Sequence, residues 1–125
     1  MLDLSHIPNS QQNVQIFNAI SGSNSWQTWQ KPRKCNYVWI MCIGGGGGGA
    51  GAPGNTGGNS PTGGGSGAVS RALYNAQQLP DTLYVQVGSG GAGGIGTTLT
   101  FGNIGSPGTR SLVALQPVIN VAQNM

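Results

Sequence analysis

Apolar residues along the chain gather in short runs that end in glycine. The run Tyr37–Ile43 reads Tyr-Val-Trp-Ile-Met-Cys-Ile and leads directly into six glycines, 44–49. Because it is β-branched and aromatic without polar alternation, it predicts a strand that is covered on both faces. A second run, 83–87, alternates apolar and polar residues, predicts a half-buried strand, and enters glycine at Gly88. A strand that opens into a glycine tract therefore occurs twice, as a weak internal repeat.

Shorter apolar stretches predict the remaining elements. Residues 68–74 fit a strand with Val69 and Leu73 on one face. Residues 13–20 fit either a short strand or one amphipathic turn. Further β-like candidates are 97–101, 111–115 and 118–121. Glycine is a poor helix former, so we expect a mainly β protein: a small β-sheet or sandwich with glycine-rich polyproline-II segments and no substantial helix.

Composition limits the size of the ordered core. Of 125 residues, 24 are Gly and 7 are Pro, a content close to that of low-complexity sequences. The supply of Leu, Ile, Val and Phe is enough for one small domain and not for two. Residues 1–25 are rich in Asn, Gln and Ser and are expected to form a polar docking arm. Residues 26–125 are expected to form a glycine-rich β domain.

The tract 44–67 contains 14 glycines in 24 residues and admits four interpretations. A flexible linker has no reason to be joined directly to apolar strands. A phosphate-binding loop needs a Lys after the glycines or an acidic residue about 20 positions on, and both are missing here. An ice-binding face needs ordered threonine rows. The favoured interpretation is a packed array of polyproline-II helices in two or three short passes, because only glycine lets neighbouring backbones approach closely.

Ionisable residues are sparse. Asp3 and Asp81 are the only acids, His6 is the only histidine, and the net charge is +3. We therefore expect no enzymatic activity, no cofactor and no metal site. Cys35 and Cys42 would lie about 23 Å apart on an extended chain, too far for a disulfide, and are expected to be buried thiols.

The basic residues are few and partly clustered. Lys31, Arg33 and Lys34 form a candidate docking patch, but five cations in all are too few for duplex binding. Trp26 and Trp29 beside this patch leave single-strand nucleic-acid binding as an alternative. Core aromatics next to a solvated basic turn are favoured, and contact with an acidic capsid surface stays open. Neither a signal peptide nor a membrane span is expected.

Several sequence features together resemble a known family. They are Trp29-Gln-Lys-Pro32, the strand Tyr37–Ile43 entering Gly44–Gly49, Gly63-Gly-Gly65, and Leu79-Pro-Asp-Thr-Leu-Tyr-Val-Gln-Val87 entering Gly-Ser-Gly-Gly-Ala-Gly-Gly94. Over about residues 26–102 the chain resembles the glycine-rich domain of bacteriophage tail-fibre and other virion proteins. The resemblance implies packed polyproline-II segments, often in homotrimers. In the related tip adhesins of T-even-type phages, loops between such segments touch the host receptor.

Size, sparse chemistry and the resemblance favour a non-enzymatic virion structural protein. We expect a capsid decoration, head-fibre or tail-fibre component that is anchored by the arm, trimeric, and assembled in the host cytoplasm with capsid, portal or tail partners. A host-receptor-binding adhesin that uses the loops 55–62 and 102–108 is the alternative. Its candidate contact residues are Asn55, Thr56, Asn59, Thr62 and Asn103. A nucleic-acid-binding accessory protein and a cellular glycine-rich protein remain further alternatives.

Overall fold

The computed structural model describes residues 13–20, 25–54, 60–98 and 102–117. It is mainly β, as predicted. Strands β1 (Gln27–Gln30), β4 (Thr82–Gln86) and β5 (Leu112–Ala114) form one antiparallel sheet in the order β1-β4-β5, and β2 (Tyr37–Ile43) and β3 (Val69–Asn75) form a second. The helix content of the described residues is the 3-10 helix η2 (Ala76–Gln78).

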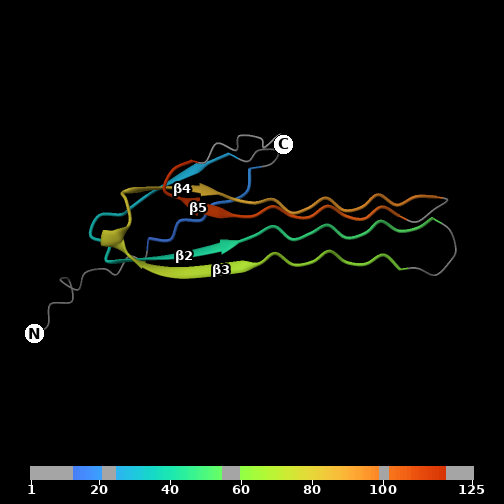
Figure 1. The fold of residues 1–125 in the computed structure, drawn as a ribbon, viewed down its shortest axis with the longest axis horizontal. Coiled ribbons are helices and arrows are strands. Elements are labelled where there is room, and N and C mark those ends of the chain that lie inside the picture. Colours follow the sequence, from blue (N-terminus) through green and yellow to red (C-terminus); the bar gives the residue numbers. More distant parts are fainter. Residues whose placement is uncertain (1–12, 21–24, 55–59, 99–101, 118–125) are drawn as a thin grey trace, which may run out of the picture.

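Four glycine-rich segments extend from the two sheets and run side by side to the far end of the molecule (Figure 1). Segment I (44–54) leaves β2 and segment II (60–68) returns to β3. Segment III (88–98) follows β4 and segment IV (102–110) returns to β5. The tract 44–67 thus makes two passes, and the predicted repeat of a strand entering glycine is confirmed at both places.

The apolar core lies between the two sheets. Along β2 the side chains alternate, so that Val38 is buried and Ile40 and Cys42 are half-buried. Leu83 of β4 meets this face from the other sheet and is 3% exposed. A crevice of about 280 Å³ is lined by residues of both sheets, including Cys42, Leu83 and Val113. The core is small, in line with the apolar content of the sequence.

The outer face of the β2–β3 pair is exposed, so the prediction that residues 37–43 are covered on both faces is wrong for the single chain. Tyr37 is 67% exposed and Trp39 is 59% exposed. Val69 and Leu73, predicted to share one face of a strand, do share it, but that face points outward. Among the described residues no strand pairs with or lies beyond this two-stranded sheet, so its outer apolar side chains have no cover.

Other expectations are corrected locally. Gln86 of β4, predicted to face solvent, is buried because it lies where the sheet joins the bundle, opposite Leu112. Residues 13–20 are neither strand nor helix. Thr97 is not in a strand but makes one isolated parallel bridge to Pro53, because it belongs to the bundle. Residues 99–101 and 118–121 lie outside the described residues.

Ser111 joins the sheets to the bundle. Its hydroxyl donates to the Ile43 carbonyl at 2.6 Å and accepts from the Gly88 amide at 3.0 Å. Ile43 ends β2, and Gly88 opens segment III. One side chain therefore fixes the point at which both strands change into glycine-rich segments.

We expect Ser111→Ala to lower the free energy of unfolding by about 1–2 kcal/mol, because two hydrogen bonds of a half-buried hydroxyl are lost together. Urea denaturation followed by circular dichroism measures this. The exposed Ser66→Ala in segment II is the matched control and should change stability little. Equal losses for the two variants would contradict the role of Ser111.

Candidate functional site

The glycine-rich segments are joined by backbone hydrogen bonds with a period of three residues. In segment I, every third amide from Gly44 donates to segment II, and every third amide from Gly45 donates to segment IV. Every third carbonyl from Gly46 accepts an amide of segment III. These bonds, 2.8–3.2 Å long, join Gly44–Ala68, Gly47–Gly65, Ala50–Thr62, Gly45–Thr109, Gly48–Ser106, Gly51–Asn103, Gly46–Gly91, Gly49–Gly94 and Ala52–Thr97. The three residues of each turn thus bond to three different neighbours, as the three-residue turn of a polyproline-II helix allows.

Segment I is antiparallel to segments II and IV but parallel to segment III. Its partners in segment III always lie 45 positions further along the chain, as in the pair Gly46 and Gly91. Strands β2 and β4 also begin 45 positions apart, at 37 and 82. Each half of the domain therefore has the same order of elements: a strand, two glycine-rich segments and a second strand. The two halves lie side by side in register.

Close packing requires glycine at every third residue. At these positions a Cβ atom would lie far inside van der Waals contact with a carbonyl oxygen of a neighbouring segment. They are 45, 48, 51 and 54 in segment I, 64 and 67 in II, 88, 91 and 94 in III, and 102, 105 and 108 in IV. At these twelve glycines only the missing side chain allows the close approach, as at the axis of collagen, and the phase ends in segment III at Thr97. The expected packed array is confirmed. Its register cannot be read from the six consecutive glycines in the sequence.

The other two positions of each triplet leave more room for a side chain, least in segment I, where a Cβ at Gly46 or Gly49 would lie 3.0–3.1 Å from a carbonyl oxygen of segment II. Ala50 and Ala52 occupy such positions in segment I. At Gly63 and Gly65 of segment II, an added Cβ would meet open space. In segments III and IV only every third residue is half-buried, and the two between are exposed. The bundle is therefore a backbone scaffold that carries side chains only on its outside.

The far end of the bundle is the place where the predicted contact loops begin. Asn55, Thr56 and Asn59 lie outside the described residues. Thr62 and Asn103 are exposed, and their carbonyls accept from consecutive amides of segment I, those of Ala50 and Gly51. The fold thus brings these two predicted residues, 41 positions apart in sequence, to one turn of the bundle.

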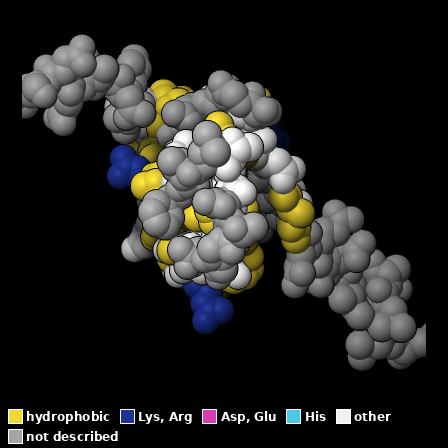
Figure 2. All heavy atoms as spheres, turned by 90° about the vertical axis from the view of Figure 1, so that its right-hand side faces the viewer, with side chains coloured by type: hydrophobic (Ala, Val, Ile, Leu, Met, Phe, Trp, Pro, Cys, Tyr) yellow, Lys and Arg dark blue, Asp and Glu magenta, His cyan; other side chains and the backbone are white. Residues whose placement is uncertain are grey.

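Two further residues at this end were not found from the sequence. Ile95 is 72% exposed and Ile104 is 88% exposed, and the Asn103 amide donates to the Ile95 carbonyl at 3.0 Å. Figure 2 looks onto this end, where the described surface is mostly uncharged and Lys and Arg side chains stand at its margin. The sequence signal for these two residues is a bulky apolar side chain within a glycine-rich segment, at a position where the packing does not require glycine.

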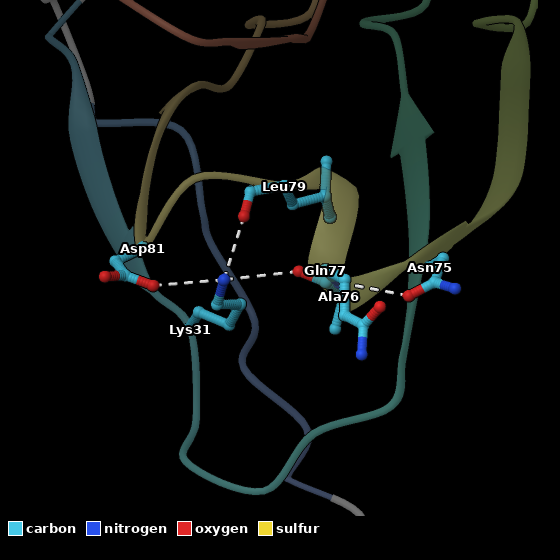
Figure 3. Close-up of polar contacts among 6 residues, drawn as sticks. All are labelled: Lys31, Asn75, Ala76, Gln77, Leu79 and Asp81. Carbon is cyan, nitrogen blue, oxygen red and sulfur yellow. Dashed lines mark hydrogen bonds and ion pairs between the residues drawn. The ribbon is translucent and has the colours of Figure 1, made fainter.

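The predicted basic patch is divided by the structure. The Lys31 ammonium pairs with the Asp81 carboxylate at 3.0 Å and donates to the carbonyls of Leu79 (2.8 Å) and Ala76 (3.2 Å), as Figure 3 shows. Its side chain is 21% exposed. Lys31 therefore ties the end of β1 to the connection between β3 and β4. Arg33 and Lys34 stay exposed in the adjoining turn, beside an open groove of about 390 Å³.

The aromatic and sulfur side chains near this turn have different surroundings. Trp26 and Trp29 are half-buried, in keeping with a core role, whereas Tyr37 is not. Cys35 and Cys42 are free thiols, as their spacing predicts, but both are half-buried, whereas buried thiols were expected. Within the described ranges no three potential metal ligands form a group. No helix of the described part has the length and apolar character to cross a membrane.

Two small sheets feeding a glycine bundle with a three-residue period define a glycine-rich structural domain. A family model described as "Glycine-rich domain" matches residues 21–123, and the chain belongs to this family. No curated protein and no solved structure matches it.

The packing makes opposite predictions for two glycines. Gly48→Ala directs a Cβ at the Ala92 carbonyl and should cost about 2–3 kcal/mol of stability, because two backbones must separate. Gly65→Ala enters open space and should be neutral or stabilising by up to about 1 kcal/mol, because it restricts the unfolded chain. Urea midpoints of the purified variants test this. Equal destabilisation would show that the bundle packs in another register.

Proposed function

We propose that this chain is a non-enzymatic structural protein of a bacteriophage virion, a small glycine-rich module displayed as a capsid decoration, head-fibre or tail-fibre component. The observation that carries the proposal is the three-way hydrogen bonding of segment I. It produces an extended rod without a hydrophobic core, which suits a spacer that holds its far end away from a surface. Membership of the glycine-rich family fits a structural module, and the virion role rests on the resemblance of the sequence to the glycine-rich domain of phage virion proteins.

The ends of the molecule suggest how it is attached. Residues 13–20 lie on the sheet side, where the Gln27 side chain donates to the Asn18 carbonyl at 2.8 Å. Val14 and Ile16 in this stretch are 73% and 79% exposed. Exposed apolar side chains on an extended segment are suited to insertion into a partner protein. We propose that this arm, assisted by exposed Arg33 and Lys34, docks onto a capsid, portal or tail protein, and that three copies are displayed together after assembly in the host cytoplasm.

The anchor is tested on particles of the phage that encodes the chain. We expect the wild-type protein in purified particles, and Val14→Asp with Ile16→Asp to reduce its copy number at least about tenfold, because charge prevents burial of the arm. Ile95→Ser with Ile104→Ser, at the far end, is the matched control and should be incorporated normally. Quantitative mass spectrometry of particles gives the result. Absence of the wild-type protein from particles would overturn the virion role, and normal incorporation of the charged variant would overturn the anchor alone.

A receptor-binding adhesin is the second candidate, favoured by the exposed isoleucines that flank Asn103 at the far end. These residues lie beside the loops at the far end, and binding residues concentrate on loops. The nucleic-acid-binding alternative has less support, because Lys31 of its basic patch is paired with Asp81.

The adhesin role predicts a defect in adsorption without a defect in assembly. Particles carrying Ile95→Ser, Asn103→Ala and Ile104→Ser together should adsorb to host cells at least about tenfold more slowly, because the contact surface is removed while the backbone bonds persist. Ser66→Ala with Gly65→Ala, in the middle of the bundle, should adsorb normally. Unchanged adsorption by the triple variant would remove the adhesin interpretation and leave the structural one in place.

A further inference from the structure

The largest group of exposed apolar side chains on the sheets is the outer face of the β2–β3 ladder. Alternate residues of β2 and their partners on β3 share it. Its apolar members are 49–67% exposed and are Tyr37, Trp39, Met41, Ile43, Val69 and Leu73. Arg71, opposite Met41, is the one charged residue on this face. We name these seven residues the outer ladder face.

The outer ladder face is large enough to support a stable interface. With about 150–250 Å² for a whole aromatic side chain, the exposed fractions correspond to roughly 600–700 Å² of apolar surface. That is at or above the largest apolar patch of a typical monomer, which is about 300–600 Å². Two such faces in contact would bury at most roughly 1,200–1,400 Å², at the lower end of the range of specific, stable interfaces.

The chemistry of the face fits a second copy of itself. Arg71 is its one charged residue, so a partner needs few complementary charges. When two copies face each other, apolar surface contacts apolar surface. Trp39 lies on the same face, in the rung next to Arg71. The guanidinium of one copy can therefore lie against an aromatic ring of the other, a favourable cation–π contact. A two-stranded sheet is also marginal by itself, and a second copy would supply the missing layer.

The sequence of β2 also supports a second copy of the chain as the partner of the outer ladder face. Tyr37–Ile43 is apolar at every position, the pattern of a strand that is buried on both faces. The single chain covers only the side of Val38, Ile40 and Cys42. We infer that the outer ladder face packs against the same face of another copy of this chain and forms the core of the oligomer. The inference rests on the self-association assumed in the proposed function, but two like faces in contact close into a two-fold dimer, so it depends neither on three copies nor on where the protein is displayed.

The test is the mass of the purified full-length chain in solution, measured by light scattering and sedimentation over a wide range of concentration. A mass of two or more chains that falls on dilution is expected. Trp39→Gln with Leu73→Lys should weaken self-association at least about thirtyfold and retain a cooperative unfolding transition. Val14→Gln with Ile16→Lys replaces apolar residues of equal or greater exposure on the arm and should retain the wild-type mass.

A second measurement covers the case in which the double variant fails to fold. On dilution of the wild-type chain, Trp39 emission should shift to longer wavelength as the face becomes exposed, whereas Trp39→Phe should show no such shift. A monomer at all concentrations, a folded Trp39→Gln, Leu73→Lys variant that keeps the wild-type mass, or a wild-type oligomer that dissociates on dilution without a shift in Trp39 emission overturns the inference. Incorporation into particles is measured separately, so a monomeric result leaves the virion role untouched.

Discussion

The structure depends on backbone hydrogen bonds made between extended segments that lie closer together than any side chain would permit. Segment I bonds to three neighbours within each turn, through Gly44, Gly45 and Gly46 and then again three residues on. The requirement for glycine at every third position follows from this closeness and not from turns or flexibility. The sheets serve the bundle by fixing the ends of all four segments, with Ser111 at the transition.

Much of this arrangement can be predicted from the sequence because the relevant signals are local. The strand Tyr37–Ile43 has the predicted bounds, and the glycine tract after it folds back once, as its length suggested. The direct attachment of the glycine tracts to apolar strands predicts packed segments, and this prediction is confirmed. The register within the bundle is not predictable in the same way, since six consecutive glycines at 44–49 fit every phase of a three-residue period.

Which face of a strand is covered depends on residues far away, and the apolar run Tyr37–Ile43 wrongly predicted cover on both faces. Val69 and Leu73 do share a face, as predicted, but only the position of the second sheet decides that this face points outward. Lys31 also depends on distant residues. Its neighbours in sequence place it in a docking patch, which stays a prediction, and its partners in space are Asp81 and the carbonyls of Ala76 and Leu79, 45 to 50 positions further along the chain.

The three-residue step of the hydrogen bonds between segments limits how such rods can change length. Because partners advance in steps of three, adding or removing one triplet in all four segments preserves every contact and alters the reach of the rod by about 9 Å. A single inserted residue would instead rotate everything beyond it by a third of a turn and direct side chains inward. The lengths of rods of this kind are therefore expected to differ by whole triplets.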